Sequence, residues 1–250
     1  MPITDPWFYA AAVPAMLLVG ISKGGFGGGL AIAGVPLMAF VVPPAQAAAI
    51  MLPILVLMDW IGVGAYRRSW DGPTLAVMVP GAAVGIALGG AVFGALDEGL
   101  VRLVLGAIAV VFSARYFMPG GRAEAAARPP SAWRGGLFGG LSGFTSTIAH
   151  AGGPPASMYL LPLRLDRTVF VGTTVIFFTA VNLMKLLPYA LIGQFSATNL
   201  LTALALAPLA PVGVLAGVWL HRRIDETLFY RLCYGFVLLT GLKLIHDGLS

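Results

Sequence analysis

Two stretches of this chain repeat one unusual motif inside strongly apolar sequence. Residues Gly25–Pro36 read GFGGGLAIAGVP, and residues Gly143–Pro154 read GFTSTIAHAGGP, 118 positions further on. Both copies share Gly-Phe, a run of small residues and Ala-Gly-x-Pro. Because glycine and proline destabilise helix interiors, each copy predicts a break in an apolar helix. Breaks at corresponding positions of two related halves are typical of the binding site of a membrane transporter.

The composition predicts an integral membrane protein with membrane lipid around it. Hydrophobic residues make up 58% of the chain and charged residues 10%, with a mean hydropathy of +0.90. Soluble domains are about one quarter charged. The first apolar run has no basic region before it, so we expect a retained helix rather than a signal peptide. The positive charges that give the net +5 lie in short loops, which argues against a nucleic-acid partner.

Hydropathy divides the chain into ten apolar segments. A full crossing needs about 20 residues, and two segments, Gly24–Val42 and Gly153–Leu163, are too glycine-rich or too short for one. We therefore predict an all-α polytopic membrane protein with about eight transmembrane helices plus two broken or re-entrant segments. The eight expected spans are Trp7–Ser22, Ala45–Tyr66, Pro73–Leu96, Gly99–Phe117, Gly135–His150, Thr168–Ile192, Thr198–Leu220 and Leu228–Ile245.

Loop charges predict the orientation of these spans. Ten of the 15 lysines and arginines occupy or flank alternate connections: Arg67, Arg68, Arg115, Arg122, Arg128, Arg134, Arg164, Arg167, Arg222 and Arg223. The intervening connections carry almost none. By the positive-inside rule, the arginine loops are cytoplasmic and both termini are periplasmic.

A polar linker at residues 119–134, expected in the cytoplasm, separates two similar halves, 1–118 and 135–250. Leu96-Asp97-Glu98 in the first half resembles Ile224-Asp225-Glu226 in the second. The predicted topology places the first acidic pair outside and the second inside, so the halves form an inverted-topology repeat. Such a repeat predicts a transport site at mid-membrane between the halves; an ancient duplication without a transport role is the alternative.

The first motif copy follows a lysine in the sequence GISKGGFGGG. Lys23 can attract an anion, Ser22 can donate a hydrogen bond, and Gly24, Gly25, Gly27 and Gly28 can expose backbone N–H groups. Two plainer interpretations exist. Lys23 can extend to the cytoplasmic surface, and the glycines can permit close helix packing.

The second copy carries hydroxyls where the first has glycines. Thr145, Ser146 and Thr147 can donate to an oxyanion or to carbonyls freed by the helix break. Gly152 and Gly153 can let substrate approach the backbone. His150 can bind substrate or move a proton, or it can hydrogen-bond an unwound carbonyl.

Three further polar residues lie inside predicted spans. Asn182 and Lys185 are three positions apart and share one helix face, which we expect to border the cavity. Asp59 is the one acid well inside a span. It can pair with Lys185 or Lys23, carry a coupling proton, or form a purely structural ion pair.

Other chemistries lack their sequence patterns. There is no metal-ligand spacing, phosphate loop or Ser/His/Asp arrangement, and the single Cys233 excludes an internal disulfide. We therefore expect no cofactor, no metal and no enzymatic activity.

The chain resembles the TauE/SafE sulfite exporter family over nearly its whole length. The most specific matches are the GISKGGFGGG segment at Gly20–Gly29 and Gly152-Gly153-Pro154, supported by the linker and the two halves. The resemblance implies export of small sulfur-containing anions, such as sulfite, sulfoacetate or other organosulfonates, across the bacterial inner membrane. The hydroxyl run of the second copy departs from a repeated glycine run. Cys233 lies outside both motifs, which argues against a cysteine relay.

Together these features predict a secondary transporter in which the two motif copies form dissimilar walls of one anion site. It would work by alternating access of the two halves. A passive anion channel, or a permease for another small organic anion, would use the same cationic cavity. The direction of transport, proton coupling through Asp59 or His150, and the choice between monomer and homodimer stay open.

Overall fold

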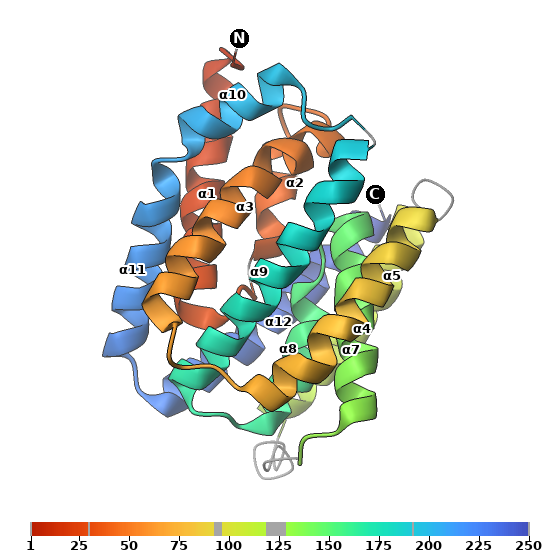
Figure 1. Cartoon of the computed structure of the whole chain (residues 1–250), viewed down its shortest axis with the longest axis vertical. Coiled ribbons are helices and arrows are strands. Elements are labelled where there is room, and N and C mark those ends of the chain that lie inside the picture. Colours follow the sequence, from red (N-terminus) through yellow and green to blue (C-terminus); the bar gives the residue numbers. More distant parts are fainter. Residues whose placement is uncertain (1, 30, 93–96, 119–128, 192, 250) are drawn as a thin grey trace.

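The computed structural model describes residues 2–29, 31–92, 97–118, 129–191 and 193–249, and within these ranges it contains helices and no strands (Figure 1). This confirms the predicted all-α class. The α-helices are α1 Pro6–Phe26, α2 Gly34–Met38, α3 Pro44–Tyr66, α4 Gly72–Ala91, α5 Glu98–Phe117, α7 Ala132–Ala149, α8 Gly153–Leu160, α9 Arg167–Leu191, α10 Ala197–Leu206, α11 Leu209–Arg223 and α12 Glu226–Leu249. Two short 3-10 helices cover Ala31–Ala33 and Leu161–Leu163.

Six of the described helices are long and apolar enough to cross a membrane: α1, α3, α4, α5, α9 and α12. The expected span Thr198–Leu220 is instead two helices, α10 and α11, bent by 44° and counted as a seventh crossing if taken together. Pro208 lies at the bend, where proline disfavours a continuous helix. The eighth expected span corresponds to α7, whose 18 residues are diluted by five glycines and Arg134.

Both predicted broken segments are present. After α1 the chain turns through a 3-10 helix into the five-residue α2, and α8 with its 3-10 extension covers Gly153–Leu163. The linker expected at residues 119–134 ends earlier than expected, because α7 already begins at Ala132. Residues 119–128 of that linker lie outside the described part of the chain.

The two acidic pairs that link the halves in sequence begin equivalent helices. The Asp97 carboxylate accepts the Leu100 N–H at 2.6 Å at the start of α5, and the Asp225 carboxylate accepts the Leu228 N–H at 2.7 Å at the start of α12. An acidic side chain in this position satisfies a helix N–H that has no partner within the helix. The sequence similarity therefore reflects a shared helix-start signal.

Glycine lets three helix pairs pack backbone against backbone. A Cβ atom at Gly20 of α1 would lie 2.8 Å from Cα of Gly213 on α11, and one at Gly106 of α5 would lie 2.7 Å from the Gly241 carbonyl on α12. On α4, a Cβ at Gly85 would overlap the Gly140 carbonyl of α7. Small residues at such contacts are typical of membrane helices. The α1–α11, α4–α7 and α5–α12 pairs are thus closely packed units.

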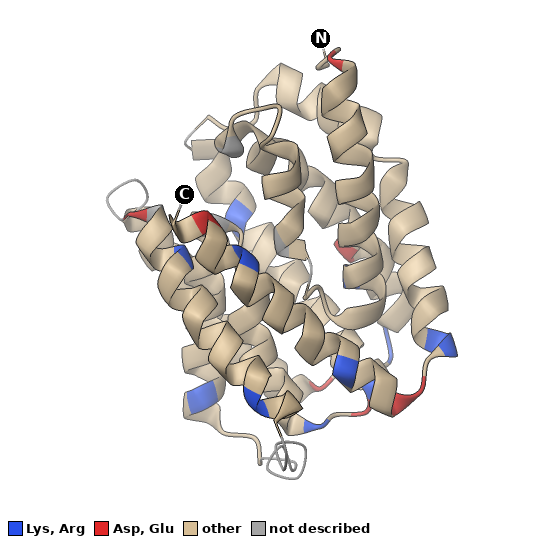
Figure 2. Cartoon of the chain, turned by 180° about the vertical axis from the view of Figure 1, so that it is seen from behind, with Lys and Arg blue, Asp and Glu red and all other residues tan. Residues whose placement is uncertain are grey.

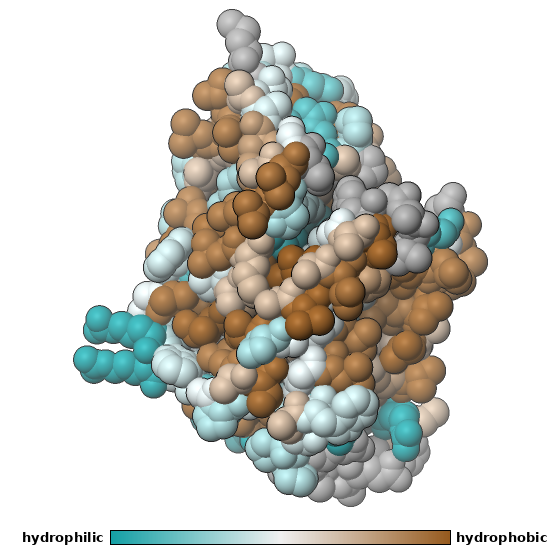
Figure 3. Space-filling view, turned by 45° about the vertical axis from the view of Figure 1, so that its right-hand side comes forward, coloured by the Kyte–Doolittle hydropathy of each residue, from teal (hydrophilic) through white to brown (hydrophobic). Residues whose placement is uncertain are grey.

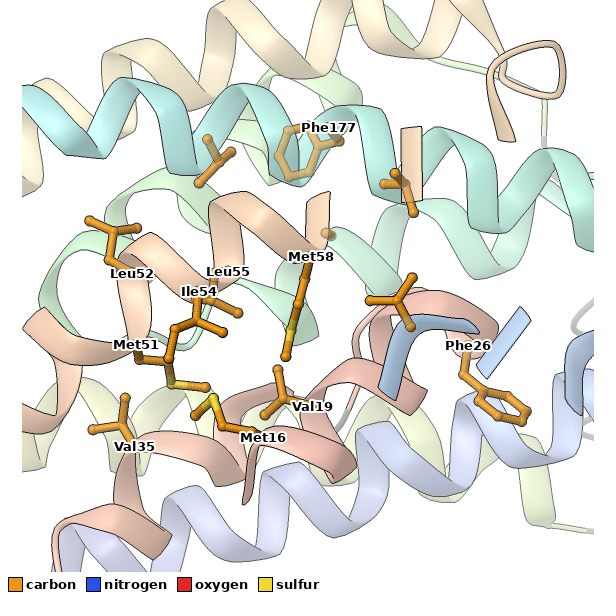
Figure 4. Close-up of a cluster of buried hydrophobic side chains, with 14 of the residues drawn as sticks. Met16, Val19, Phe26, Val35, Met51, Leu52, Ile54, Leu55, Met58 and Phe177 are labelled. Carbon is orange, nitrogen blue, oxygen red and sulfur yellow. The ribbon is translucent and has the colours of Figure 1, made fainter. Parts of the chain in front are cut away.

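Buried apolar side chains fill the space between α1, α2, α3 and α9 (Figure 4). Met16 and Val19 of α1 face Met51 and Met58 of α3, all essentially buried. Gly34, from the first motif copy, makes room for Met51, whose side chain a Cβ at that position would overlap. The glycine of the Ala-Gly-x-Pro ending therefore has a packing reason in the first copy.

The surface carries a broad apolar band and a charged end. Figure 3 shows hydrophobic residues over much of the face that it presents, with hydrophilic residues near the top and toward the bottom. Large side chains such as Leu88, Val111 and Leu187 are more than half exposed along the helices. Lysines and arginines gather at the end opposite the N-terminus (Figure 2), where the α3–α4, α8–α9 and α11–α12 connections lie (Figure 1). This distribution matches a protein surrounded by lipid with one basic face.

Candidate functional site

The turns of the two motif copies meet inside the molecule. In the first copy, Gly27 and Gly28 adopt positive φ angles of 68° and 77°, which glycine tolerates without strain. In the second, His150 ends α7 with φ 51°. A Cβ atom on Gly153 would come within 3.4 Å of the Gly28 carbonyl oxygen. The two helix breaks therefore face each other.

The first break is held by side chains from other helices. Tyr66 of α3 donates its hydroxyl to the Gly24 carbonyl at 2.7 Å, and Thr240 of α12 donates to the Gly29 carbonyl at 2.7 Å. These carbonyls lie at a helix end, where partners within the helix run out. A glycine turn without polar side chains of its own thus depends on its neighbours.

The second break is held by hydroxyls of its own helix. The Thr145 hydroxyl can donate to the Leu141 carbonyl at 2.8 Å, one turn back along α7, or to the Ala151 carbonyl at 3.0 Å, and Ser142 donates to the Gly152 carbonyl at 2.7 Å. Thr147 donates to the Gly143 carbonyl at 2.9 Å, one turn back along α7. The hydroxyl run was expected to donate either to an oxyanion or to backbone carbonyls. Thr145 and Thr147 donate to backbone carbonyls. The chemical difference between the two copies is therefore partly a difference in how each turn is supported.

A cavity of about 40 Å³ lies where the turns meet. A single water needs roughly 10–15 Å³ on this measure, so the cavity has room for a few water-sized groups, similar to an ion of four heavy atoms. Its walls come from both motif copies and from α3 and α9: Lys23, Gly28, Ala31, Met51, Leu55, Ser146, His150, Gly152, Gly153, Phe178, Asn182 and Lys185.

Lys23 forms a buried ion pair on one side of the cavity. Its Nζ atom lies 2.6 Å from Oδ1 of Asp59, and Lys23 is 7% exposed. The other carboxylate oxygen of Asp59 accepts a hydrogen bond from Nδ2 of Asn182 at 2.6 Å. Lys23 therefore does not extend to the surface. Asp59 was expected to pair with either Lys23 or Lys185, and it pairs with Lys23.

Lys185 also borders the cavity and is fully buried. Its Nζ atom donates to Oγ of Ser146 at 3.1 Å and lies 3.0 Å from Nδ1 of His150. Nε2 of His150 in turn lies 2.7 Å from the hydroxyl of Tyr189, one turn further along α9. Lys185 thus borders the cavity, as its helix face predicts, and His150 bonds side chains rather than an unwound carbonyl.

Eight of the candidate residues border the cavity, and seven do not. The eight are Lys23, Gly28, Ser146, His150, Gly152, Gly153, Asn182 and Lys185. Asp59 lies behind this wall, bonded to Lys23 and Asn182. Gly24 and Gly25 pack against the α11 backbone, Gly27 packs against Phe170, and the carbonyl of Ser22 accepts the Gly28 N–H at 2.9 Å. Thr145 and Thr147 support the backbone of α7, as described above.

Four apolar wall residues were not predicted: Ala31, Met51, Leu55 and Phe178. A signal for three of them exists in the sequence. Met51 and Leu55 precede Asp59 at intervals of four residues, and Phe178 precedes Asn182 by four, so each shares a helix face with a polar site residue. Once Asp59 and Asn182 are candidates, the four-residue spacing therefore predicts these three apolar residues on the same helix faces.

The site offers two ammonium groups, a hydroxyl and an amide, all on side chains that are at most 7% exposed. Such donors suit a small oxyanion, because charge-assisted hydrogen bonds are strongest away from water. Among the described residues, no three His, Cys, Asp or Glu side chains are grouped to hold a metal ion. Cys233 is buried in α12, and its Sγ atom lies 3.8 Å from the Phe26 carbonyl oxygen. It does not border the cavity.

Comparison with known proteins gives one match. The family model described as sulfite exporter TauE/SafE matches residues 12–244, which is nearly the whole chain. No curated protein and no solved structure matches the chain. This family consists of multi-pass membrane transporters, in agreement with the apolar helices and with the cationic cavity at the two helix breaks. The chain belongs to the sulfite exporter TauE/SafE family.

Proposed function

We infer that this protein is a secondary transporter that exports a small sulfur-containing anion, such as sulfite, sulfoacetate or another organosulfonate, across the bacterial inner membrane. The anion would bind in the cavity between the two motif copies. Lys23 and Lys185 would supply positive charge, and Ser146 and Asn182 would donate hydrogen bonds. The glycine turns at Gly28 and at Gly152 and Gly153 would bring backbone close to the ion.

The observation that carries this proposal is the position of Lys185. A buried ammonium group is costly in a membrane protein and is normally paired or functional. Among the described residues, no carboxylate lies within ion-pair distance of Lys185, whose Nζ contacts Ser146 and His150 and lies 5.6 Å from the centroid of the Tyr189 ring. An anion in the cavity would complete its coordination.

Alternating access of two inverted halves, 1–118 and 135–250, is the proposed mechanism. The helix contacts support this division, because they come in reciprocal pairs. The first helix of each half, α1 or α7, packs against the fourth segment of the other half, α11 or α4. The third segments, α3 and α9, pack against each other, as do the last helices, α5 and α12. A two-fold relation between halves predicts such pairings.

The proposed orientation places the basic end in the cytoplasm and both termini in the periplasm. The gathering of lysines and arginines at the end opposite the N-terminus supports it (Figure 2).

Anion flux in proteoliposomes tests the function. Vesicles containing the full chain should release loaded sulfite faster than empty vesicles. Lys185→Ala and Lys23→Ala should each reduce this flux at least about tenfold, which corresponds to about 1.4 kcal/mol. Lys243→Ala is the matched control, because Lys243 is 34% exposed, forms an ion pair with Asp247 and does not border the cavity.

A second measurement separates a transporter from a channel. External sulfite should accelerate exchange of labelled internal sulfite if one site alternates between the two sides. Undiminished flux in both cavity lysine variants would exclude the cationic site. Flux without such counter-flow would favour a passive anion channel.

A further inference from the structure

We propose that the cavity selects singly charged oxyanions over doubly charged ones of the same shape. This inference rests on the proposed function, because it concerns the charge of the ion that the same cavity would take. It follows from the fixed charges around the cavity. Lys23 and Lys185 are positive and Asp59 is negative, so their sum is one positive charge. The ligand class is therefore a monosulfonate or another singly charged oxyanion, which among the anions proposed above includes hydrogensulfite and excludes the doubly charged sulfoacetate.

Asp59 neutralises one of the two lysines. Its Oδ1 atom lies 2.6 Å from Nζ of Lys23, and Asp59 is 1% exposed. Asn182 donates to the other oxygen, so the carboxylate is held on both sides. Breaking a buried ion pair of this kind leaves an uncompensated charge and is costly. Lys23 therefore borders the cavity as half of a neutral pair.

Lys185 provides the remaining charge. An ammonium group has three N–H donors and no acceptor. Two of the donors of Lys185 point to Ser146 and His150, and Nζ also lies 5.6 Å from the centroid of the Tyr189 ring. The third donor has no further hydrogen bond to the described residues, so a group in the cavity that Lys185 borders can accept it. With Lys185 charged, Nδ1 of His150 must accept, so the ring is neutral and carries its proton on Nε2, facing Tyr189. His150 then adds no charge.

The charged side chains that border the cavity are those of Lys23 and Lys185. Arg102 of α5 acts electrostatically on His150, but it is not one of the residues that border the cavity. Asp59 is the acid that interacts with both cavity lysines. An ion with one negative charge would therefore neutralise the walls, whereas an ion with two would leave a net negative charge in surroundings of low dielectric constant.

Methanesulfonate and sulfate form a suitable pair of probes. Both are tetrahedral at sulfur and similar in size, and at neutral pH they differ by one charge. Equilibrium binding to the purified full chain in detergent or nanodiscs should show methanesulfonate binding at least about tenfold more tightly than sulfate. Thermal stabilisation by each ion provides an independent readout.

Asp59→Asn should change the preference. The amide keeps one oxygen to accept from Asn182 but removes the negative charge, so the walls carry two positive charges. The ratio of methanesulfonate to sulfate affinity should fall at least about tenfold. Asp247→Asn removes the acid of the Lys243–Asp247 pair, neither member of which borders the cavity, and should leave the ratio unchanged.

The outcomes distinguish this inference from the proposed function. Equal or tighter binding of sulfate by the wild-type chain would overturn the monoanion preference while leaving a sulfur-anion site in place. Binding of neither probe, together with sulfite flux that is insensitive to Lys185→Ala, would overturn both. If Asp59→Asn does not fold, the comparison of the two ions on the wild-type chain still decides. An unchanged affinity ratio in folded Asp59→Asn would contradict the proposed charge balance.

Discussion

Nζ of Lys185 lies 3.0 Å from Nδ1 of His150, and His150 is held there by a left-handed backbone conformation with φ 51°. The end of α7 thus positions the imidazole that contacts the buried lysine of α9. The same turn places Gly152 and Gly153 in the cavity wall. The backbone of the second motif copy and the charge of the site are therefore linked through one residue.

The backbone at His150 predicts an order of substitutions. Asparagine adopts the left-handed conformation readily, whereas a β-branched residue does not. Both His150→Asn and His150→Val lose the ring contacts with Lys185 and Tyr189. We expect His150→Val to be less stable than His150→Asn by about 1–2 kcal/mol. Unfolding of the two variants in detergent measures the difference, and equal stabilities would contradict the backbone argument.

Glycines in α4 predict opposite effects of one substitution. A Cβ atom at Gly85 would overlap the Gly140 carbonyl of α7, while one at Gly90 would meet nothing within 4 Å. Gly85→Ala should destabilise the protein by about 1–3 kcal/mol through overpacking. Gly90→Ala should be neutral or stabilising by up to about 1 kcal/mol, because alanine favours helix. Thermal unfolding of the pair tests this, and a tolerated Gly85→Ala would argue against close α4–α7 packing.

The first helix break predicts a cost for removing one hydroxyl. Tyr66 is buried and donates to the Gly24 carbonyl at 2.7 Å, so Tyr66→Phe should cost about 1–3 kcal/mol of stability. Tyr9 donates to the Ile3 carbonyl at the same distance near the N-terminus, where the bond is only partly buried. Tyr9→Phe should therefore cost less. Comparable losses in the two variants would show that Tyr66 has no special role at the break.

The second break predicts a similar contrast among threonines. The Thr145 hydroxyl lies 2.8 Å from the Leu141 carbonyl within α7 and 3.0 Å from the Ala151 carbonyl beyond the end of α7, so it can donate at the break, whereas Thr179 donates to a carbonyl within α9. Thr145→Val should cost about 1–3 kcal/mol, and Thr179→Val less than about 1 kcal/mol. Chemical unfolding measures both. If Thr145→Val lowered anion affinity with no loss of stability, Thr145 would be a ligand-binding residue instead.

Much of the fold was predictable because helix breaks and apolar lengths are local properties. Gly27 and Gly28 interrupt the first long apolar stretch, and Gly152 and Gly153 interrupt the second. The bend between α10 and α11 was missed, although Pro208 lies there. The cause is that proline is also tolerated inside other helices of this chain, such as Pro80 in α4.

The site was predictable in its cations but not in its partners. Burial of an ionisable group in an apolar span identified Lys185 and Asp59. Whether Asp59 would pair with Lys23 or Lys185 depended on the packing of α1 against α3 and α9, which one sequence does not specify. The direction of the Thr145 and Thr147 hydroxyls likewise depended on which carbonyls the turn leaves without partners.

Protection of a cysteine in the cavity tests the central claim most directly. Ser146 borders the cavity, so Ser146→Cys, in a Cys233→Ser background, should react with a small neutral thiol reagent. Saturating methanesulfonate should slow this reaction at least about tenfold, as expected of a site whose bound state predominates. It should leave Thr179→Cys, outside the cavity wall, unaffected. Equal reaction rates of the Ser146→Cys variant with and without the anion would contradict an anion site between the two motif copies.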